Sequence, residues 1–360
     1  MARLPYGAFA RLWGVGFGLL ATLLLPGEAH GRPAQDEPPV GINAQLEDRY
    51  PDRRSAFPDG VIGLADVTYA TPTGFRPLTL DLYLPAKHNA LLPVIVFVHG
   101  GGWMSGHARH AGAFENWPRA LASIAAHGYV IASVNYRLSN EAVSPAAEID
   151  VKSAIAWLRA SAQRYFIEKT RFGIWGVSAG GQLAALAGTS CDVAELTPEG
   201  MAGRESVCVQ AVAAWYGVFD FAPLVADAAL TPPVARYLGC IDRSCSEEQV
   251  RLASPIRFID GSDPPFLLVH GARDQVVPVA QSTAFHAALQ SASVRSKLLV
   301  VDNVDHSLIG PTPDDTRAAN LRALKATIDF FDCVLREKVC EHPRRLPGTT
   351  RDGPTPADSH

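Results

Sequence analysis

The sequence Gly-Val-Ser-Ala-Gly at positions 176–180 decides the fold that we expect for this chain. Before it, residues 171–175 are a short, apolar, β-prone run, and after it residues 181–187 are rich in helix-forming residues. A serine on a sharp turn between a strand and a helix projects its hydroxyl at the helix N-terminus, and small neighbours let the backbone pack tightly around it. The pattern therefore predicts that Ser178 is the nucleophile of a serine hydrolase. Because such a pentapeptide also arises by chance, the prediction depends on the rest of the sequence.

Apolar runs and helical stretches alternate along the chain from residue 93 onward. Continuous apolar runs are typical of strands covered on both faces, and their alternation with helices predicts an α/β fold with a mostly parallel sheet flanked by helices. Two earlier strands are expected at 61–70 and 75–84, and residues 78–84 show the alternation typical of a half-buried antiparallel strand. Further strands are expected at 94–98, 129–134, 172–177, 207–215, 266–270 and 298–301. Helices are expected at 117–126, 145–165, 179–188, 279–291 and 314–336.

A serine nucleophile needs a base to take its proton and an acid to orient that base. His306 and Asp274 each follow an expected strand of the sheet. We expect their loops to carry both side chains to the edge of the sheet that holds Ser178. The order Ser178, Asp274, His306 is that of α/β-hydrolases, which supports these three residues as the catalytic set.

A glycine-rich loop supplies candidates for an oxyanion hole. His-Gly-Gly-Gly-Trp at 99–103 follows the expected strand at 94–98. Glycines let backbone N–H groups approach a ligand closely, because no side chain intrudes. The sequence therefore predicts that the N–H groups of Gly101, Gly102 and Ala179 bind the oxyanion.

Other residues compete for these roles. Asp305 adjoins His306 and would have to bend back sharply onto its ring, whereas Asp302 lies at a strand end. His99 is expected to hold the glycine-rich loop through side-chain hydrogen bonds rather than to act as a base. His107 and His110 have metal-ligand spacing but no evident third ligand, so we expect no metal site.

The walls of the substrate pocket are expected to include aromatic side chains. Trp103, Tyr216 and Phe219 lie on loops or strand ends that should face the nucleophile, and they are the candidate substrate-binding residues. Residues 217–263 form a long, proline-containing interval that interrupts the strand-helix rhythm. A connection of this length is usually functional, so we predict a small lid or cap insertion there.

On these motifs the chain resembles the hormone-sensitive-lipase-like esterases, and more closely their exported bacterial branch of feruloyl-esterase-like proteins (BD-FAE). The resemblance implies an α/β-hydrolase fold and carboxylic-ester hydrolysis without a metal or organic cofactor. It also implies the roles of nucleophile, acid and base for Ser178, Asp274 and His306. Members often have a longer N-terminal cap. In this chain only residues 32–60 lie between the predicted signal peptide and the first expected strand, so the lid must come largely from 217–263. The matching stretches are 80–85, 99–103, 134–138, 147–157, 176–182, 270–277 and 305–307.

The N-terminus predicts export. Arg3 and Arg11 precede an apolar run at 12–25, and small-x-small cleavage sites follow after Ala29 or Gly31. Residues 1–31 are therefore a predicted signal peptide, with a retained anchor as the alternative. The run is short for a membrane span, so we expect a periplasmic or secreted protein without stable membrane insertion after cleavage.

The six cysteines form three pairs of near neighbours in the sequence. Proximity suggests local disulfides, although six cysteines allow fifteen pairings and six reduced thiols in a cytosolic enzyme remain the alternative. The suggested pairs are Cys191 with Cys208, Cys240 with Cys245, and Cys333 with Cys340.

The remaining segments complete the domain organisation that we expect. Residues 32–60 are a predicted linker or N-terminal arm, 61–340 the α/β-hydrolase domain, and 341–360 a disordered tail.

Composition limits the partners. The net charge of −4, with no phosphate-binding loop and no zinc motif, argues against nucleic acid and cofactors. The expected partner is a short-chain, aryl or carbohydrate-linked ester, and the oligomeric state stays open. The alternatives are a serine peptidase of the prolyl-oligopeptidase type and a non-catalytic hydrolase-like binding protein.

Overall fold

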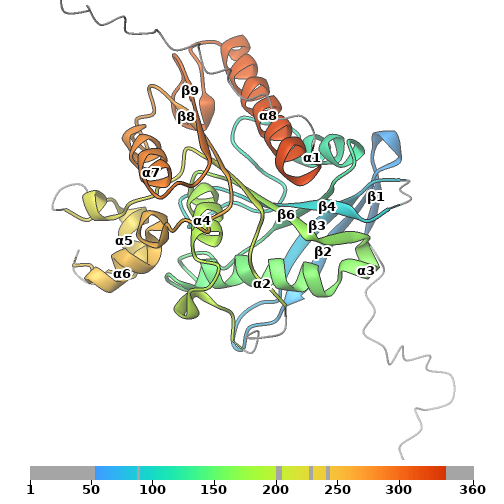
Figure 1. The fold of residues 1–360 in the computed structure, drawn as a ribbon, viewed down its shortest axis with the longest axis horizontal. Helices are drawn as coiled ribbons and strands as arrows, with labels where there is room; N and C mark the ends of the chain where they lie inside the picture. The colour runs from blue at the N-terminus through green and yellow to red at the C-terminus, as the bar shows by residue number, and fades with distance from the viewer. Residues whose placement is uncertain (1–52, 87–89, 200–204, 227–229, 241–243, 338–360) are drawn as a thin grey trace, which may run out of the picture. The chain divides into compact units, whose positions relative to one another are not determined.

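A nine-stranded β-sheet organises the computed structural model, which describes residues 53–86, 90–199, 205–226, 230–240 and 244–337 (Figure 1). The strand order is β1-β2-β3-β5-β4-β6-β7-β8-β9. Pairings among β1, β2, β3 and β5 are antiparallel, and all pairings from β5 to β9 are parallel, so the predicted mostly parallel sheet is confirmed. The strands are β1 (Arg54–Ala56), β2 (Ile62–Ala70), β3 (Leu78–Leu84), β4 (Leu92–Val98), β5 (Val130–Val134), β6 (Ile167–Val177), β7 (Ala211–Trp215), β8 (Phe266–Gly271) and β9 (Ser296–Val301).

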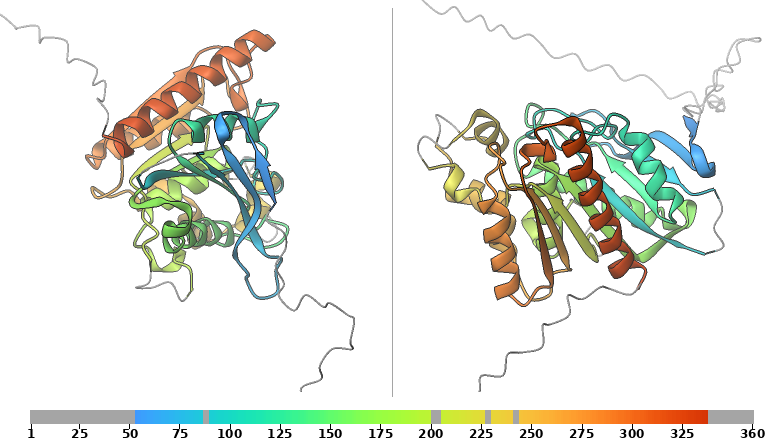
Figure 2. Two further views of the ribbon diagram at one scale, coloured as in Figure 1. Left: turned by 90° about the vertical axis from the view of Figure 1, so that its right-hand side faces the viewer. Right: turned by 90° about the horizontal axis from the view of Figure 1, so that it is seen from above.

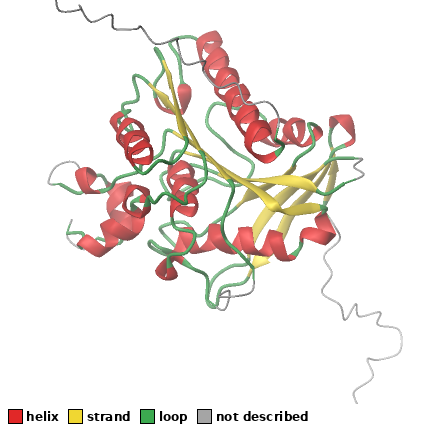
Figure 3. Ribbon diagram, viewed as in Figure 1, coloured by secondary structure: helices red, strands yellow, loops and turns green. Residues whose placement is uncertain are grey.

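Helices cover both faces of the sheet, as Figures 1 and 3 show from one direction and Figure 2 shows from two others. Helices α1 and α8 pack on one face, and α2, α4 and α7 pack on the other. Alternate residues of β4 enter the two cores: Val94 and Val96 face α2 and α4, whereas Ile95 and Phe97 face α1 and α8. The helices are α1 (Trp117–Ala126), α2 (Ala146–Ala160), α3 (Ala162–Tyr165), α4 (Ala179–Thr189), α5 (Pro232–Leu238), α6 (Glu247–Ala253), α7 (Ala280–Ser291) and α8 (Pro313–Leu335).

Some boundaries differ from the sequence prediction. The helix expected at 145–165 is divided into α2 and α3 at Ser161. The strand expected at 207–215 begins only at Ala211. Before it, the carbonyl groups of Ser206 and Cys208 accept hydrogen bonds from the Arg159 guanidinium. A carbonyl bonded to a buried side chain is less available to a neighbouring strand.

The end of the predicted arm is part of the sheet. Strand β1 pairs with β2 in antiparallel register, and the Phe57 ring packs on Tyr83 with 5.5 Å between ring centroids. The three residues of β1 are all exposed, so the sequence carries no apolar alternation that would reveal the strand. The predicted signal peptide and C-terminal tail lie outside the described residues.

Residues 217–263 contain helices α5 and α6, which lie together at one side of the unit (Figure 1). Two disulfides join Cys191 to Cys208 and Cys240 to Cys245, with Cα–Cα distances of 4.9 and 4.6 Å. Cys333 lies on α8, and its suggested partner Cys340 lies outside the described residues. Within the described ranges, no helix has the length and apolar character needed to cross a bilayer.

Candidate active site

Ser178 sits on a strained turn between β6 and α4. Its φ of 54° and ψ of −123° lie in a backbone region that residues other than glycine rarely adopt. Its N–H donates to the Trp215 carbonyl at 2.9 Å. A Cβ at Gly176 would collide with the Gly180 carbonyl, and one at Gly180 would collide with the Val98 carbonyl. Glycine at both positions is what allows the turn to pack so tightly, so the local geometry is the strand-turn-helix that the sequence predicts.

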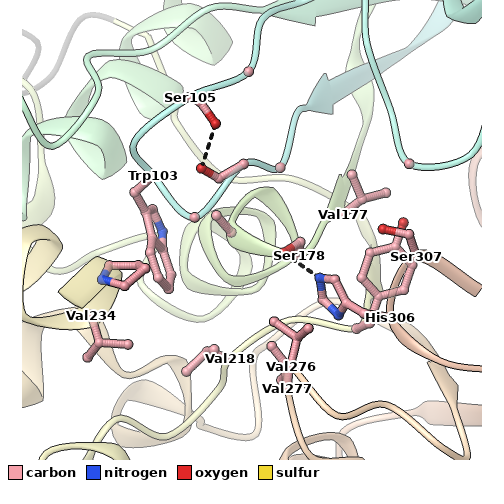
Figure 4. A pocket seen from close by; sticks show the side chains of 18 of the residues that line it. Trp103, Ser105, Val177, Ser178, Val218, Val234, Val276, Val277, His306 and Ser307 are labelled. Atoms are coloured by element: carbon pink, nitrogen blue, oxygen red, sulfur yellow. Dashed lines mark hydrogen bonds between the residues drawn. The ribbon is translucent and has the colours of Figure 1, made fainter. Parts of the chain in front are cut away.

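The structure brings Ser178, His306 and Asp274 into one hydrogen-bonded chain. His306 Nε2 lies 3.0 Å from Ser178 Oγ (Figure 4), and on the other side of the ring His306 Nδ1 lies 2.8 Å from Asp274 Oδ2. With a proton on Nδ1 donated to the carboxylate, Nε2 is left to accept the proton of the serine hydroxyl. The three side chains come from the ends of β6, β8 and β9, which explains why they meet at one edge of the sheet.

The Asp274 carboxylate is fully buried and heavily hydrogen-bonded. Its Oδ1 accepts the N–H groups of Val276 and Val277 at 2.9 and 2.8 Å, and its Oδ2 lies 3.3 Å from Nε2 of buried His270. Burial alone raises the pKa of Asp274, but the hydrogen bonds from His270, His306 and the Val277 N–H outweigh it and hold the pKa well below its ordinary value. The group is therefore an anion throughout the neutral range.

The two competing acids lie elsewhere. The Asp305 carboxylate accepts the backbone N–H groups of Gln275 and His306 at 2.8 and 2.7 Å, so it shapes the loop rather than bonding the imidazole ring. Asp302 is exposed at the end of β9.

The glycine-rich loop lines the same cavity as Ser178. The Gly101 carbonyl accepts the N–H groups of Met104 and Ser105, both at 3.1 Å, and it also accepts the Ser105 hydroxyl (Figure 4). Gly101 has a φ of +119°, and a Cβ there would collide with the Ser105 carbonyl. Among the described residues, no acceptor bonds the N–H of Gly101, Gly102 or Ala179. All three residues line the cavity in front of Ser178.

His99 supports this loop from below. Its Nδ1 donates to the Gly100 carbonyl at 2.7 Å, its ring stacks on Tyr136 at 4.4 Å, and its carbonyl accepts the Tyr136 hydroxyl at 3.0 Å. Burial lowers the pKa of His99 from 6.5 to about 4, although the hydrogen bond to Gly100 opposes that shift. The residue is thus a neutral, buried part of the scaffold, 1 % exposed.

This burial predicts an acid sensitivity. Because the pKa of His99 is lowered from 6.5 to about 4 on folding, the unfolded chain binds more protons than the folded one between those values, and stability falls as the pH falls through that window. His99→Asn keeps a donor near the Nδ1 position but does not titrate. We expect urea unfolding at pH 7 and pH 5 to show a larger loss of stability in wild type than in the variant; equal losses would contradict the assignment.

A cavity of about 830 Å³ opens in front of Ser178. Apolar side chains line much of the cavity, including Val276 and Val277 near His306, where Ser307 adds a hydroxyl group. Figure 4 shows Trp103, Val218 and Val234 on the apolar side, with Ser307 beyond His306. The segment predicted as a lid contributes Val218, Leu224, Thr231, Pro233 and Val234 to the lining.

Two of the three candidate substrate-binding residues line the cavity, and the third does not. Trp103 and Tyr216 line the cavity, and the Tyr216 ring meets the His306 ring edge-on at 4.9 Å. Phe219 does not reach it: the side chain is fully buried and stacks on Phe285 of α7 at 4.6 Å. Its neighbour Val218 faces the cavity instead, because successive residues of an extended segment point in opposite directions.

Several lining residues were missed by sequence reasoning. Leu224 lies on a short turn and Pro233 and Val234 begin the seven-residue helix α5, which is too short for its periodicity to mark an inward face. Val276 lies just after Asp274 and is 68 % exposed at the rim. No pattern in the sequence signals these positions.

One cluster of three potential metal ligands occurs in the described part of the chain, namely Cys191, Asp192 and Cys208. Its two sulfur atoms are joined in a disulfide, so they are not thiolate ligands. His107 and His110 have ring centroids 6.2 Å apart and belong to no such cluster among the described residues.

Comparison with known proteins agrees with the family resemblance of the sequence. The BD-FAE family model matches residues 80–289. Esterase LipC of Mycobacterium tuberculosis is 34% identical over 208 residues, which cover 56% of this chain and 49% of the relative. Esterase LipQ of the same organism is 35% identical over 203 residues, covering 56% and 46%. The chain spans about half the length of these curated relatives.

Solved structures agree on the α/β-hydrolase fold. A truncated carbohydrate esterase from gut microbiota superposes with a TM-score of 0.61 at 27% identity, covering 78% of this chain and 97% of that one. The bifunctional GH43-CE protein of Bacteroides eggerthii gives 0.62 at 30% identity, covering 79% and 38%. The expected fold is therefore confirmed.

Proposed function

We propose that this chain, which belongs to the BD-FAE family, is a carboxylic-ester hydrolase that uses Ser178 as nucleophile, His306 as base and Asp274 as acid. The hydrogen-bonded chain from Ser178 through His306 to Asp274, at the floor of a cavity, is the observation that carries the proposal. The names of the relatives LipC and LipQ, both esterases, support it.

The proposed reaction has two halves. Ser178 Oγ attacks the ester carbonyl carbon while His306 Nε2 takes the hydroxyl proton, and Asp274 stabilises the imidazolium that forms. The tetrahedral intermediate then collapses: the ester C–O bond breaks, and His306 returns the proton to the leaving alcohol. Water attacks the acyl-enzyme by the same steps in reverse, which releases the acid and restores Ser178.

The N–H groups of Gly101, Gly102 and Ala179 are the proposed donors to the oxyanion. Donors aimed at the charge that develops in the transition state contribute about 3 kcal/mol each in comparable sites. That all three N–H groups lack another acceptor in the described chain supports this role, because each is left to bond a ligand.

The position of His306 orients the substrate. The imidazole must reach the leaving oxygen, so the alcohol lies on the side of Tyr216 and Ser307, and the acyl group points towards Val218 and Val234. An apolar acyl side suits short-chain or aryl acyl groups, and the Ser307 hydroxyl among the apolar side chains near His306 offers a hydrogen-bonding group to alcohols that include carbohydrates. The gut carbohydrate esterase with the same fold supports the carbohydrate part of this proposal.

We further propose that the protein is exported. Disulfides form and persist in oxidising compartments, and two are present among the described residues.

The test is hydrolysis of p-nitrophenyl acetate and p-nitrophenyl butyrate by the full chain. We expect turnover of both esters, with saturation in substrate and a burst of p-nitrophenol where deacylation is slow. A purified, folded protein that hydrolyses neither ester and does not react with a fluorophosphonate would refute the proposal.

A further inference from the structure

The proposed oxyanion donors come from two separate segments. Gly101 and Gly102 lie on the loop after β4, whereas Ala179 begins α4. Three amides can bind one oxygen only if the two segments keep a fixed spacing. The beginning of the loop is already fixed, because a Cβ at Gly180 would collide with the carbonyl groups of Val98 and His99. The far end of the loop needs an anchor of its own.

Gln182 provides a bond between that far end and the nucleophile helix. It lies on the first turn of α4 and is fully buried. Its Oε1 accepts the indole N–H of Trp103 at 2.9 Å, and Trp103 directly follows Gly102. This hydrogen bond thus joins the loop of two proposed donors to the helix of the third.

The amide of Gln182 is held in one orientation. Its Nε2 donates to the Ala253 carbonyl at 2.9 Å, and the Tyr237 hydroxyl oxygen lies 3.2 Å from its Oε1. Turning the amide over would place its NH₂ against the indole N–H of Trp103 and its oxygen against the Ala253 carbonyl. Gln182 is therefore fixed from the side of α6 and α5 before it meets Trp103.

The indole is equally constrained. The Trp103 ring stacks on Tyr237 at 4.3 Å with 10° between planes, and its carbonyl accepts the Ser139 N–H at 2.7 Å. Trp103 has a φ of 57°, a backbone conformation that the surroundings must maintain. The Tyr237 hydroxyl in turn donates to buried Glu148 of α2.

We infer that Gln182 is a positioning residue for the oxyanion hole, which fixes the Gly101 and Gly102 amides relative to Ala179 by bonding Trp103. The inference rests on the proposed function. Gln182 is not among the described residues that line the cavity, so it acts through Trp103 and not by contact with substrate. Loss of the bond lets the Gly101 and Gly102 amides drift relative to Ala179, while the part of the wall formed by Val218, Leu224 and Val234 stays in place. The effect falls on kcat, because the oxyanion exists only in the transition state and intermediate.

The test is a double-mutant cycle with Gln182→Met and Trp103→Phe. The first removes the acceptor at similar side-chain length, and the second removes the donor while keeping an aromatic ring against Tyr237. With p-nitrophenyl acetate we expect each single variant to lower kcat by about tenfold, and Gln182→Met, whose side chain does not line the cavity, to keep KM within about twofold. The double variant should be no worse than the more affected single variant, because the same bond is already lost.

A charged inhibitor and a structural control sharpen the result. A trifluoromethyl ketone forms a hemiketal oxyanion on the serine, and its inhibition constant should rise in parallel with the fall in kcat/KM. Thr189→Val removes a buried hydroxyl at the other end of α4, which bonds the Pro255 carbonyl at 3.2 Å, and should leave kcat within about twofold.

Each other outcome overturns the inference. Unchanged kcat in both single variants, a change confined to KM, or effects that multiply in the double variant would show that the bond does not set the oxyanion hole. The milder Trp103→Phe variant decides the matter if Gln182→Met fails to fold. A wild-type protein without ester turnover would instead refute the proposed function, and this inference with it.

Discussion

Ser178→Ala is expected to lower kcat for p-nitrophenyl acetate by about 10⁴- to 10⁶-fold, to a residual rate from binding and the oxyanion amides alone. The reason is chemical, because the methyl group has no oxygen to attack the carbonyl and no acyl-enzyme can form. The fold should survive, since alanine removes one oxygen atom at the surface of the cavity and keeps the turn between β6 and α4. Rates and far-UV circular dichroism, measured on the same preparation, check both statements.

A matched serine variant controls for the substitution itself. Ser123 is exposed on α1, where its hydroxyl donates to the Ala120 carbonyl at 2.7 Å, and Ser123→Ala should react at the wild-type rate. A fluorophosphonate should label wild type and Ser123→Ala but leave Ser178→Ala unlabelled. Turnover by Ser178→Ala near the wild-type rate would exclude this serine as the nucleophile.

The sequence could indicate those candidate site residues that stand at the ends of apolar strands. Ser178, Asp274 and His306 each follow a run that enters the sheet as a buried or partly buried strand, and parallel strands end at a common edge. The family resemblance, which the match over 80–289 confirms, depends on the same strand-end motifs. The elements of the fold follow from the same runs, because apolar periodicity directly reflects burial between two helical layers.

Contacts between distant segments could not be predicted from the sequence. The Trp103–Gln182 bond joins residues 79 positions apart, and the Tyr237–Gln182 contact joins residues 55 apart. Neither pair has a spacing that indicates contact. The orientation of Phe219 was missed for another reason: beyond the end of β7 a shift of one residue exchanges the cavity side for the core side, so Val218 lines the pocket and Phe219 packs on α7.

Asp274→Asn is expected to lower kcat/KM by about 10⁴-fold while leaving the site assembled. A neutral amide does not stabilise the imidazolium. Its NH₂ group also favours the tautomer of His306 with the proton on Nε2, which no longer accepts the proton of Ser178.

The stability of the fold should also depend on pH through Asp274. Because hydrogen bonds hold the pKa of Asp274 below its ordinary value, the carboxylate contributes stability above that value, and the contribution is lost as the pH falls below about 4. Unfolding curves of wild type and Asp274→Asn should therefore converge in acid.

The rival acids supply the controls for this prediction. Asp302→Asn alters an exposed carboxylate at the end of β9 and should react within about twofold of wild type. Asp305→Asn still offers an oxygen to the N–H groups of Gln275 and His306, so it should retain far more activity than Asp274→Asn. If Asp274→Asn kept most of its turnover while one of the other two lost it, the acid would have to be reassigned. The ranking separates the candidates even if all three variants lose some activity, because only the Asp274 side chain bonds Nδ1 of His306 among the described residues.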